Sequence, residues 1–268
     1  MKFLYFVARE SIPESVVAFT AGIVKRTDST VTMLVVAKDT ESLENLQEGI
    51  VAAERGFGNV PLEIKTGVGD PCDLMEREIE TNGYDMVIMY VRQRRRVLPS
   101  SFRFLSQKII KLSPIPIMLV RKTNLKLERV LICTGGQDIS EPVVRLSAKL
   151  ARMAGLQTTL LYVSGVVPSM YTGMNVMEET LEDLLGTDTP LANHLRACAE
   201  ILSENNVKAE IEIRHGDVAE SILNEAKEEK HDLIVLGSSE NNSLTGMLLG
   251  NVTQQIINRA ESAVLIVK

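Results

Sequence analysis

The chain has 268 residues, 45% of them hydrophobic and 24% charged, with a formal net charge of −6 and a pI near 5.3. This acidic balance argues against general nucleic-acid binding, and the absence of an apolar run of about 18 residues argues against a membrane span. Three widely spaced cysteines provide no metal-ligand spacing and favour a reducing compartment, so we expect a cytoplasmic protein with two domains.

The first half of the chain alternates short apolar runs with amphipathic stretches. The strands expected in this half are 3–7, 32–36, 62–65, 86–90 and 115–120. Runs that are apolar almost throughout are typical of parallel strands covered by helices on both faces. A polar, basic segment, 121–128, follows the fifth strand and is expected to connect two domains.

The second half repeats the same order of elements. Its expected strands are 130–134, 158–163, 210–214, 233–237 and 263–268, and its expected helices are 141–153, 219–229 and 251–260. Strands alternating with helices predict an α/β fold in which five parallel strands form an open, Rossmann-like sheet. The sequence therefore predicts two tandem sheets of this kind, in domains 1–121 and 129–268.

The two halves are diverged copies of one unit. The pair Gly69-Asp70 recurs 147 residues later as Gly216-Asp217, where each Asp is expected to cap a helix. Near the start of each half the shift is 127 residues, which aligns Phe3 with Val130. The difference places an insertion of 20 residues within 164–190. This methionine-rich stretch could cover a ligand or a partner, or form an ordinary surface helical hairpin.

The stretch 237–253 leaves a strand, crosses a polar loop and enters a helix. Gly237 and Gly250 can adopt positive φ and allow the backbone to approach a ligand closely. Gly250 stands at the predicted helix start, where free N–H groups and the helix dipole favour an anion. Further hydrogen-bonding side chains are Ser238, Ser239, Asn251 and Thr253. These features suit a polyphosphate, although a glycine before a helix also serves simple turn formation.

The stretches 231–238, 247–253 and 263–268 resemble the C-terminal signature of the universal stress protein family, and the resemblance extends over both halves. It implies tandem sheets of the adenine-nucleotide alpha hydrolase-like type and, in one branch, ATP binding through three spaced glycines followed by Ser or Thr. The first and third glycines correspond to Gly237 and Gly250. The second is replaced by Glu240 and the hydroxyl residue by Asn251, and Glu240 would repel a triphosphate unless an ion such as Mg²⁺ intervenes.

The resemblance also implies an adenine site beside the first two strands of the second half. The family usually has an Asp at the end of the first strand, and this chain has Gly135 there. The ligand set implied for ATP or another adenine nucleotide is Thr134, Gly135, Val163, Gly237, Ser239, Gly250, Asn251, Val252 and Thr253.

The first half has lost the glycine loop. Tyr90 and Arg103 occupy the two glycine positions, so at most one nucleotide site per chain is expected, in the second half. An arginine-rich loop, 92–96, lies between them. It could hold a phosphate or an acidic protein partner, or it could be a solvated loop, and nucleic acid is the weakest of its candidate ligands.

Three functions stay open: a stress-response nucleotide sensor, a partner-binding protein with a decayed site, and a weak ATPase or self-phosphorylating protein. The sequence contains neither a Gly-x-Ser-x-Gly elbow nor a Gly-Lys-Ser/Thr loop, and its three histidines lack metal-ligand spacing, so no catalytic or metal-binding residue is expected. The resemblance implies that the last strands of the halves, 115–121 and 263–268, pair within the chain as a pseudo-dimer. Two chains could also form a homodimer.

Overall fold

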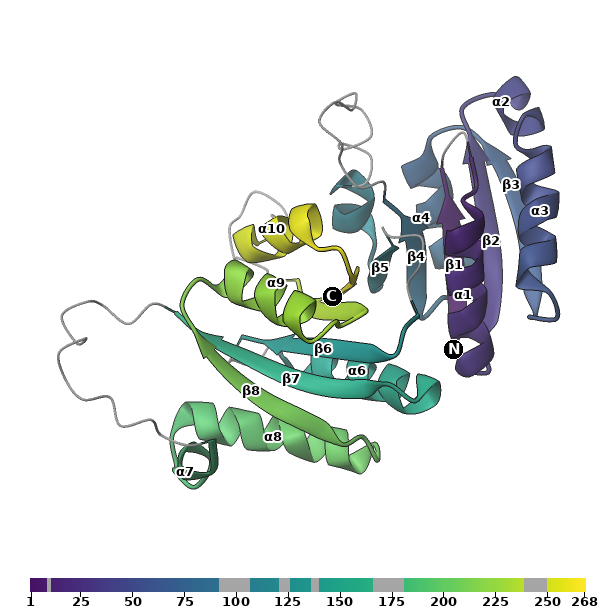
Figure 1. Cartoon of the computed structure of the whole chain (residues 1–268). Helices are drawn as coiled ribbons and strands as arrows, with labels where there is room; N and C mark the ends of the chain where they lie inside the picture. Colours follow the sequence, from purple (N-terminus) through teal and green to yellow (C-terminus); the bar gives the residue numbers. More distant parts are fainter. Residues whose placement is uncertain (9–10, 92–106, 121–125, 136–139, 166–180, 239–249) are drawn as a thin grey trace. The chain divides into compact units, whose positions relative to one another are not determined.

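The computed structural model describes residues 1–8, 11–91, 107–120, 126–135, 140–165, 181–238 and 250–268. The chain divides into two compact units, Met1–Leu127 and Glu128–Lys268. Each unit is an α/β structure in which parallel strands are flanked by helices (Figure 1). The predicted fold class is confirmed.

The sheet of the N-terminal unit has the strand order β3-β2-β1-β4-β5. Its strands are β1 (Lys2–Val7), β2 (Thr30–Ala37), β3 (Leu62–Val68), β4 (Met86–Tyr90) and β5 (Ile117–Val120). All neighbouring pairs are parallel. Strands β1 and β2 are buried almost throughout, whereas β3 alternates half-buried and exposed residues. Charged side chains such as Glu63 on β3 are typical of an edge strand that must not pair with other chains.

The helices of the N-terminal unit are α1 (Glu14–Arg26), α2 (Thr40–Glu44), α3 (Gln47–Phe57) and α4 (Pro71–Asn82), and residues 107–112 are also helical. Helices α1 and α3 pack together, and α4 contacts β2. Asp70 caps α4, because its carboxylate accepts hydrogen bonds from the backbone N–H groups of Cys72 (2.9 Å) and Asp73 (3.2 Å). The predicted cap is therefore confirmed.

The C-terminal unit has the equivalent strand order, β8-β7-β6-β9-β10. Its strands are β6 (Arg129–Thr134), β7 (Gln157–Ser164), β8 (Ala209–His215), β9 (Leu233–Gly237) and β10 (Ala263–Val267). All four pairings are parallel. Strand for strand, this sheet repeats the sheet of the N-terminal unit, as a duplicated sequence requires.

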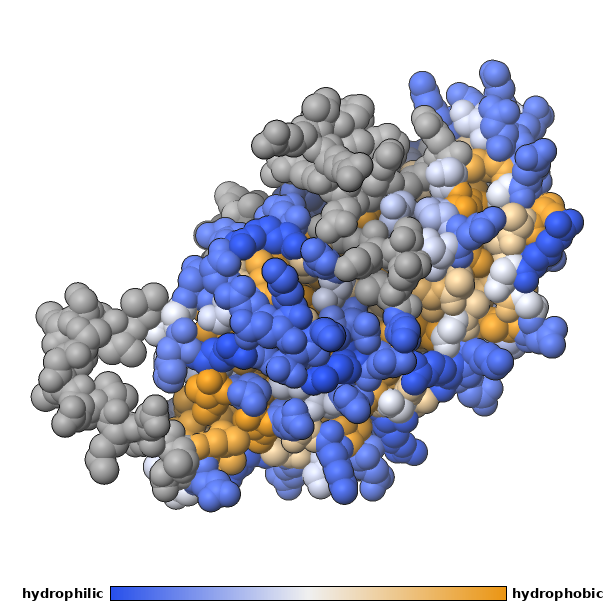
Figure 2. Space-filling model, in the orientation of Figure 1, coloured by the Kyte–Doolittle hydropathy of each residue, from blue (hydrophilic) through white to orange (hydrophobic). Residues whose placement is uncertain are grey.

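Helices cover both faces of the second sheet. They are α6 (Ser140–Ala154), α7 (Leu181–Leu185), α8 (Pro190–Glu204), α9 (Val218–Glu228) and α10 (Asn251–Arg259). Helix α6 packs against α8, and α9 packs against α10 on the opposite face (Figure 1). Helix α9 buries Ala219, Ile222 and Ala226, and its outer surface is hydrophilic (Figure 2). Among the described helices, none has the length and apolar character needed to cross a membrane.

Helix α8 lies where the sequence analysis predicted no helix. Its start carries a recognisable signal, since Pro190 occupies the first turn and the Thr189 hydroxyl accepts a hydrogen bond from the N–H of Ala192 (3.2 Å). Of the predicted insertion, 164–190, the described part includes α7, and residues 166–180 lie outside the described residues. The covering role considered for the insertion's methionines falls on those residues.

Candidate functional site at the carboxyl edge of the second sheet

Three predicted site residues end neighbouring strands of the second sheet. Thr134 is the last residue of β6, Gly237 is the last of β9, and Val163 is the last but one of β7. Strands β7, β6 and β9 are adjacent and parallel, so these residues share the carboxyl edge of the sheet. Gly135 follows Thr134, and a Cβ atom added to it would meet no atom of the described residues within 4 Å. The edge therefore has open space beside the residues predicted to contact adenine.

The start of α10 faces the same edge. In a parallel β-α-β crossover the helix runs against the strands, so its N-terminus lies where β9 ends. Gly250 is the N-cap residue, and no side chain of a described residue makes a cap hydrogen bond there. The first turn, Asn251 to Thr253, contains no acidic residue, which leaves the positive end of the helix dipole uncompensated within that turn. This helix start is suited to an anion.

Gly250 does not use the positive φ that the sequence analysis noted as open to glycine. Its φ and ψ are −55° and 148°, an extended conformation that any residue can adopt. The case for glycine at this position therefore rests on space for a ligand. Gly237 is also outside the set of glycines with positive φ, which at this edge of the unit includes Gly216 at 122°.

Several other predicted residues lie outside the described part of the chain. They are Ser239, Glu240, Arg103 and the loop 92–96. Tyr90, which replaces the first glycine in the N-terminal unit, is the half-buried last residue of β4. Its bulky ring stands at the strand end where the C-terminal unit has Gly237.

Helix α8 adds a histidine that the sequence analysis did not assign to the site. The Oγ1 atom of Thr134 contacts Nε2 of His194, and Sγ of Cys198 lies 3.5 Å from the same nitrogen. Burial raises the pKa of the Cys198 thiol, so this thiol stays protonated at neutral pH. The helical spacing of His194 and Cys198, four residues apart, could have indicated that they share one face.

The other two histidines do not contact Thr134 in the part of the chain that the structure describes. His231 is buried, and its Nε2 atom lies 3.0 Å from Oγ1 of Thr159. His215 ends β8 and is exposed. Within the described residues, no group of three or more His, Cys, Asp or Glu side chains could hold a metal ion.

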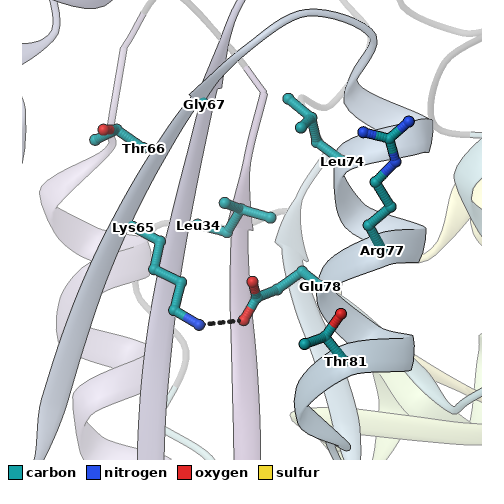
Figure 3. A pocket seen from close by; sticks show the side chains of 8 residues that line it. All are labelled: Leu34, Lys65, Thr66, Gly67, Leu74, Arg77, Glu78 and Thr81. Carbon is teal, nitrogen blue, oxygen red and sulfur yellow. Dashed lines mark hydrogen bonds and ion pairs between the residues drawn. The ribbon is translucent and has the colours of Figure 1, made fainter.

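The N-terminal unit has a hollow of about 390 Å³ between its sheet and α4 (Figure 3). It is lined by Leu34, Lys65, Thr66, Gly67, Leu74, Arg77, Glu78 and Thr81. At its base the Lys65 ammonium donates to Oε1 of Glu78 at 2.8 Å. The hollow runs along the side of α4 rather than at the start of the helix, so it lacks the free N–H groups that characterise the edge of the second unit.

Open parallel sheets that keep polar groups and a free helix start at their carboxyl edge define the class of Rossmann-like α/β proteins that bind ligands there. The universal stress protein family model matches residues 9–121 and 126–268, so this chain belongs to the universal stress protein family and carries the family's domain in tandem.

Individual universal stress proteins are also similar to this chain in sequence and in structure. A universal stress protein of Methanocaldococcus jannaschii is 27% identical over 150 residues, which cover 56% of this chain and 87% of that protein. The universal stress protein E homolog of Haemophilus influenzae is 21% identical over 224 residues, which cover 79% and 72%. The crystal structure of a universal stress protein from Archaeoglobus fulgidus matches with a TM-score of 0.73 and 17% identity, covering 100% of this chain and 98% of that chain. The last similarity shows the shared fold.

Proposed function

We propose that the C-terminal unit binds one adenine nucleotide, such as ATP or AMP, and that the protein is a nucleotide-dependent sensor or regulator in a stress response. The observation that carries this proposal is the start of α10, which no described side chain caps, on the edge where Thr134, Gly135 and Gly237 lie. A free helix start favours phosphate, and the open space at Gly135 leaves room for a base.

Six of the predicted residues would contact the nucleotide directly in this proposal. The backbone N–H groups of Asn251, Val252 and Thr253 would hold phosphate oxygens, and the Asn251 amide would donate a further hydrogen bond. Thr134, Gly135 and Val163 would contact the adenine. Because Glu240 would repel a triphosphate, ATP would bind together with Mg²⁺, or a nucleotide of lower charge would be preferred.

Titration calorimetry with ATP and Mg²⁺ tests the proposal. We expect one site per chain in the wild type and at least tenfold weaker binding in Gly250→Arg, since the added side chain fills the space at the helix start. Gly22→Arg is a matched control, because Gly22 lies in helix α1 of the other unit and has open space around it. It should bind like the wild type.

Two sites per chain, or undiminished binding by Gly250→Arg, would contradict the assignment. A complete lack of binding by the wild type would favour the second candidate, a partner-binding protein with a decayed nucleotide site. Two sequence features favour that candidate: Gly135 offers no side chain to hydrogen-bond a base, and Glu240 carries a repelling charge. Co-purification of a protein partner without bound nucleotide would support it.

We also propose that β5 and β10 pair within one chain. Each strand stands last in the order of its own unit's sheet, and both consist entirely of apolar residues. A strand of this kind with a free backbone edge invites aggregation, so mutual pairing would protect both edges.

A further inference from the structure

Both units contain the same polar cluster between the sheet and the helix that follows its edge strand. In the N-terminal unit, the Tyr84 hydroxyl donates to Oε1 of Glu78 at 2.5 Å. The residues aligned with these two, 147 positions later, are His231 and Glu225. Hence the two units differ at one comparable buried position: a tyrosine in the first and a histidine in the second.

The histidine is fixed on several sides. Its side chain is buried, at 3% exposure, and Nε2 lies 3.0 Å from the Thr159 hydroxyl on β7. Its backbone N–H donates to the carbonyl of Ala226 in α9 (2.8 Å), and its carbonyl accepts from the Ser262 hydroxyl just before β10 (2.6 Å). His231 thus joins α9, β7 and the start of β10, two residues before β9 begins.

Charged groups of both signs surround the ring. Arg129 on β6 opposes a positive charge, whereas Glu225 and Glu229 at the end of α9 favour one. Glu225 is already paired with Arg214, and on β8 the residue in register with Thr159 is the exposed Glu210.

Burial is the largest influence, and it lowers the pKa of His231, with Arg129 acting in the same direction. The Nδ1 atom is buried and makes no hydrogen bond within the part of the chain that the structure describes, and the nearby backbone of Glu225, which favours a proton on the ring, does not outweigh burial. The folded unit therefore holds this imidazole neutral.

The aligned site in the N-terminal unit does not change its charge when the pH falls. Burial raises the pKa of the Tyr84 phenol, so the ring stays uncharged in acid as well as at neutral pH. The Lys2 ammonium, aligned with Arg129, lies 4.5 Å from the centre of the Tyr84 ring, a favourable cation–π contact. The basic residue at this aligned position, Lys2 or Arg129, is therefore favourable beside a tyrosine ring but repels a protonated histidine.

We propose that His231 makes the C-terminal unit responsive to acid: protonation places a positive charge on the buried ring near Arg129 and loosens the junction that leads into β9, while the N-terminal unit stays closed. The loosened strand ends at Gly237, so the change reaches the carboxyl edge of the sheet. This inference does not depend on nucleotide binding.

The direction in which the stability of the C-terminal unit changes with pH follows from proton linkage. When the unit opens, His231 regains the ordinary pKa of about 6.5 and binds more protons than in the folded unit. The stabilisation from the neutral, buried ring is therefore complete above about pH 6.5 and decreases as the pH falls below it. Opening should increase up to tenfold for each unit by which the folded state lowers the pKa.

Hydrogen exchange of the full chain, read by mass spectrometry at about pH 7.5 and about pH 5 and corrected for intrinsic rates, tests the proposal. In the wild type, peptides from β6, β7 and β9 should open more at the lower pH than peptides from β1, β2 and β4. His231→Tyr, which copies the N-terminal unit, should remove most of this difference. Tyr84→His should transfer it to the N-terminal unit.

An equal pH response of the two units in the wild type, or an unchanged response in His231→Tyr, would overturn the proposal. NMR titration of the His231 ring in the wild type provides a readout that needs no variant. A pKa below the ordinary value supports the mechanism, and a normal or raised value excludes it.

Discussion

Glu225 is a carboxylate whose side chain is only 2% exposed, and its charge is met by the guanidinium of Arg214. Removing a single partner of a buried pair leaves an uncompensated charge. Because Arg214 is itself 36% exposed, water reduces this penalty, and we expect Arg214→Ala to lower the free energy of unfolding of the C-terminal unit by about 2 kcal/mol. Urea denaturation followed by a probe in this unit measures the loss.

Arg145→Ala is the matched control for that substitution. Arg145 pairs with Glu141 at 2.7 Å one helical turn away, and both side chains are more than half exposed. Exposed pairs of this kind contribute little, so the midpoint of unfolding should stay unchanged. Equal losses of stability in the two variants would show that burial of Glu225 does not strengthen its pair with Arg214.

At the residue scale, the sequence predicted what depends on local chemistry. Asp70 and Asp217 were predicted as caps from the Gly-Asp pair, and both accept backbone hydrogen bonds. The contact of His231 with Thr159 joins residues 72 positions apart, and that of His194 with Thr134 joins residues 60 apart. Such pairs depend on strand order and helix docking, which one sequence read alone does not specify.

At the scale of elements, prediction was best for strands inside the sheet. Strands β4 and β9 have the predicted bounds, because each apolar run begins directly after an Asp, and the run of β9 ends at a glycine. Strand β3 was predicted to end at Lys65 and extends to Val68, since the pairing with β2 continues where the apolar pattern stops. Helix α8 was missed, because it follows the insertion without a matching landmark in the first half.

The cap of α9 gives an element-scale prediction. Asp217 accepts a hydrogen bond from the N–H of Glu220 at 2.9 Å. Asp217→Ala should lower the free energy of unfolding of the C-terminal unit by about 1 kcal/mol, because a helix N–H group loses its partner. Asn caps helices as well as Asp, so Asp217→Asn should retain most of the stability. A loss of the same size in both variants, measured by thermal or urea denaturation, would exclude capping as the cause.

At the scale of the whole molecule, the proposed pairing of β5 with β10 predicts a monomer of 29.6 kDa whose end strands are protected. Light scattering after size exclusion gives the mass, and hydrogen exchange gives the protection of 117–120 and 263–267. Slow exchange in both segments at monomer mass agrees with pairing inside one chain. Protection that appears only with a dimer would indicate pairing between chains, and fast exchange in both segments would contradict pairing of either kind.

The hollow beside Gly67 carries information about how the duplicated halves diverged. The carboxylate is shared, as the half-buried Glu78 and the buried Glu225, but its cation comes from Lys65 in one half and from Arg214, which aligns with Gly67, in the other. Residues two apart on a strand share a face, so the cation can change position without leaving the carboxylate. If one cation were lost before the other was gained, the carboxylate would be left without a partner. A change from one cation to the other therefore costs least through an ancestor that carried both. A side chain at Gly67 would begin 3.0 Å from Cδ1 of Leu74, so Leu74 would have to shift before the hollow of about 390 Å³ could take a second cation.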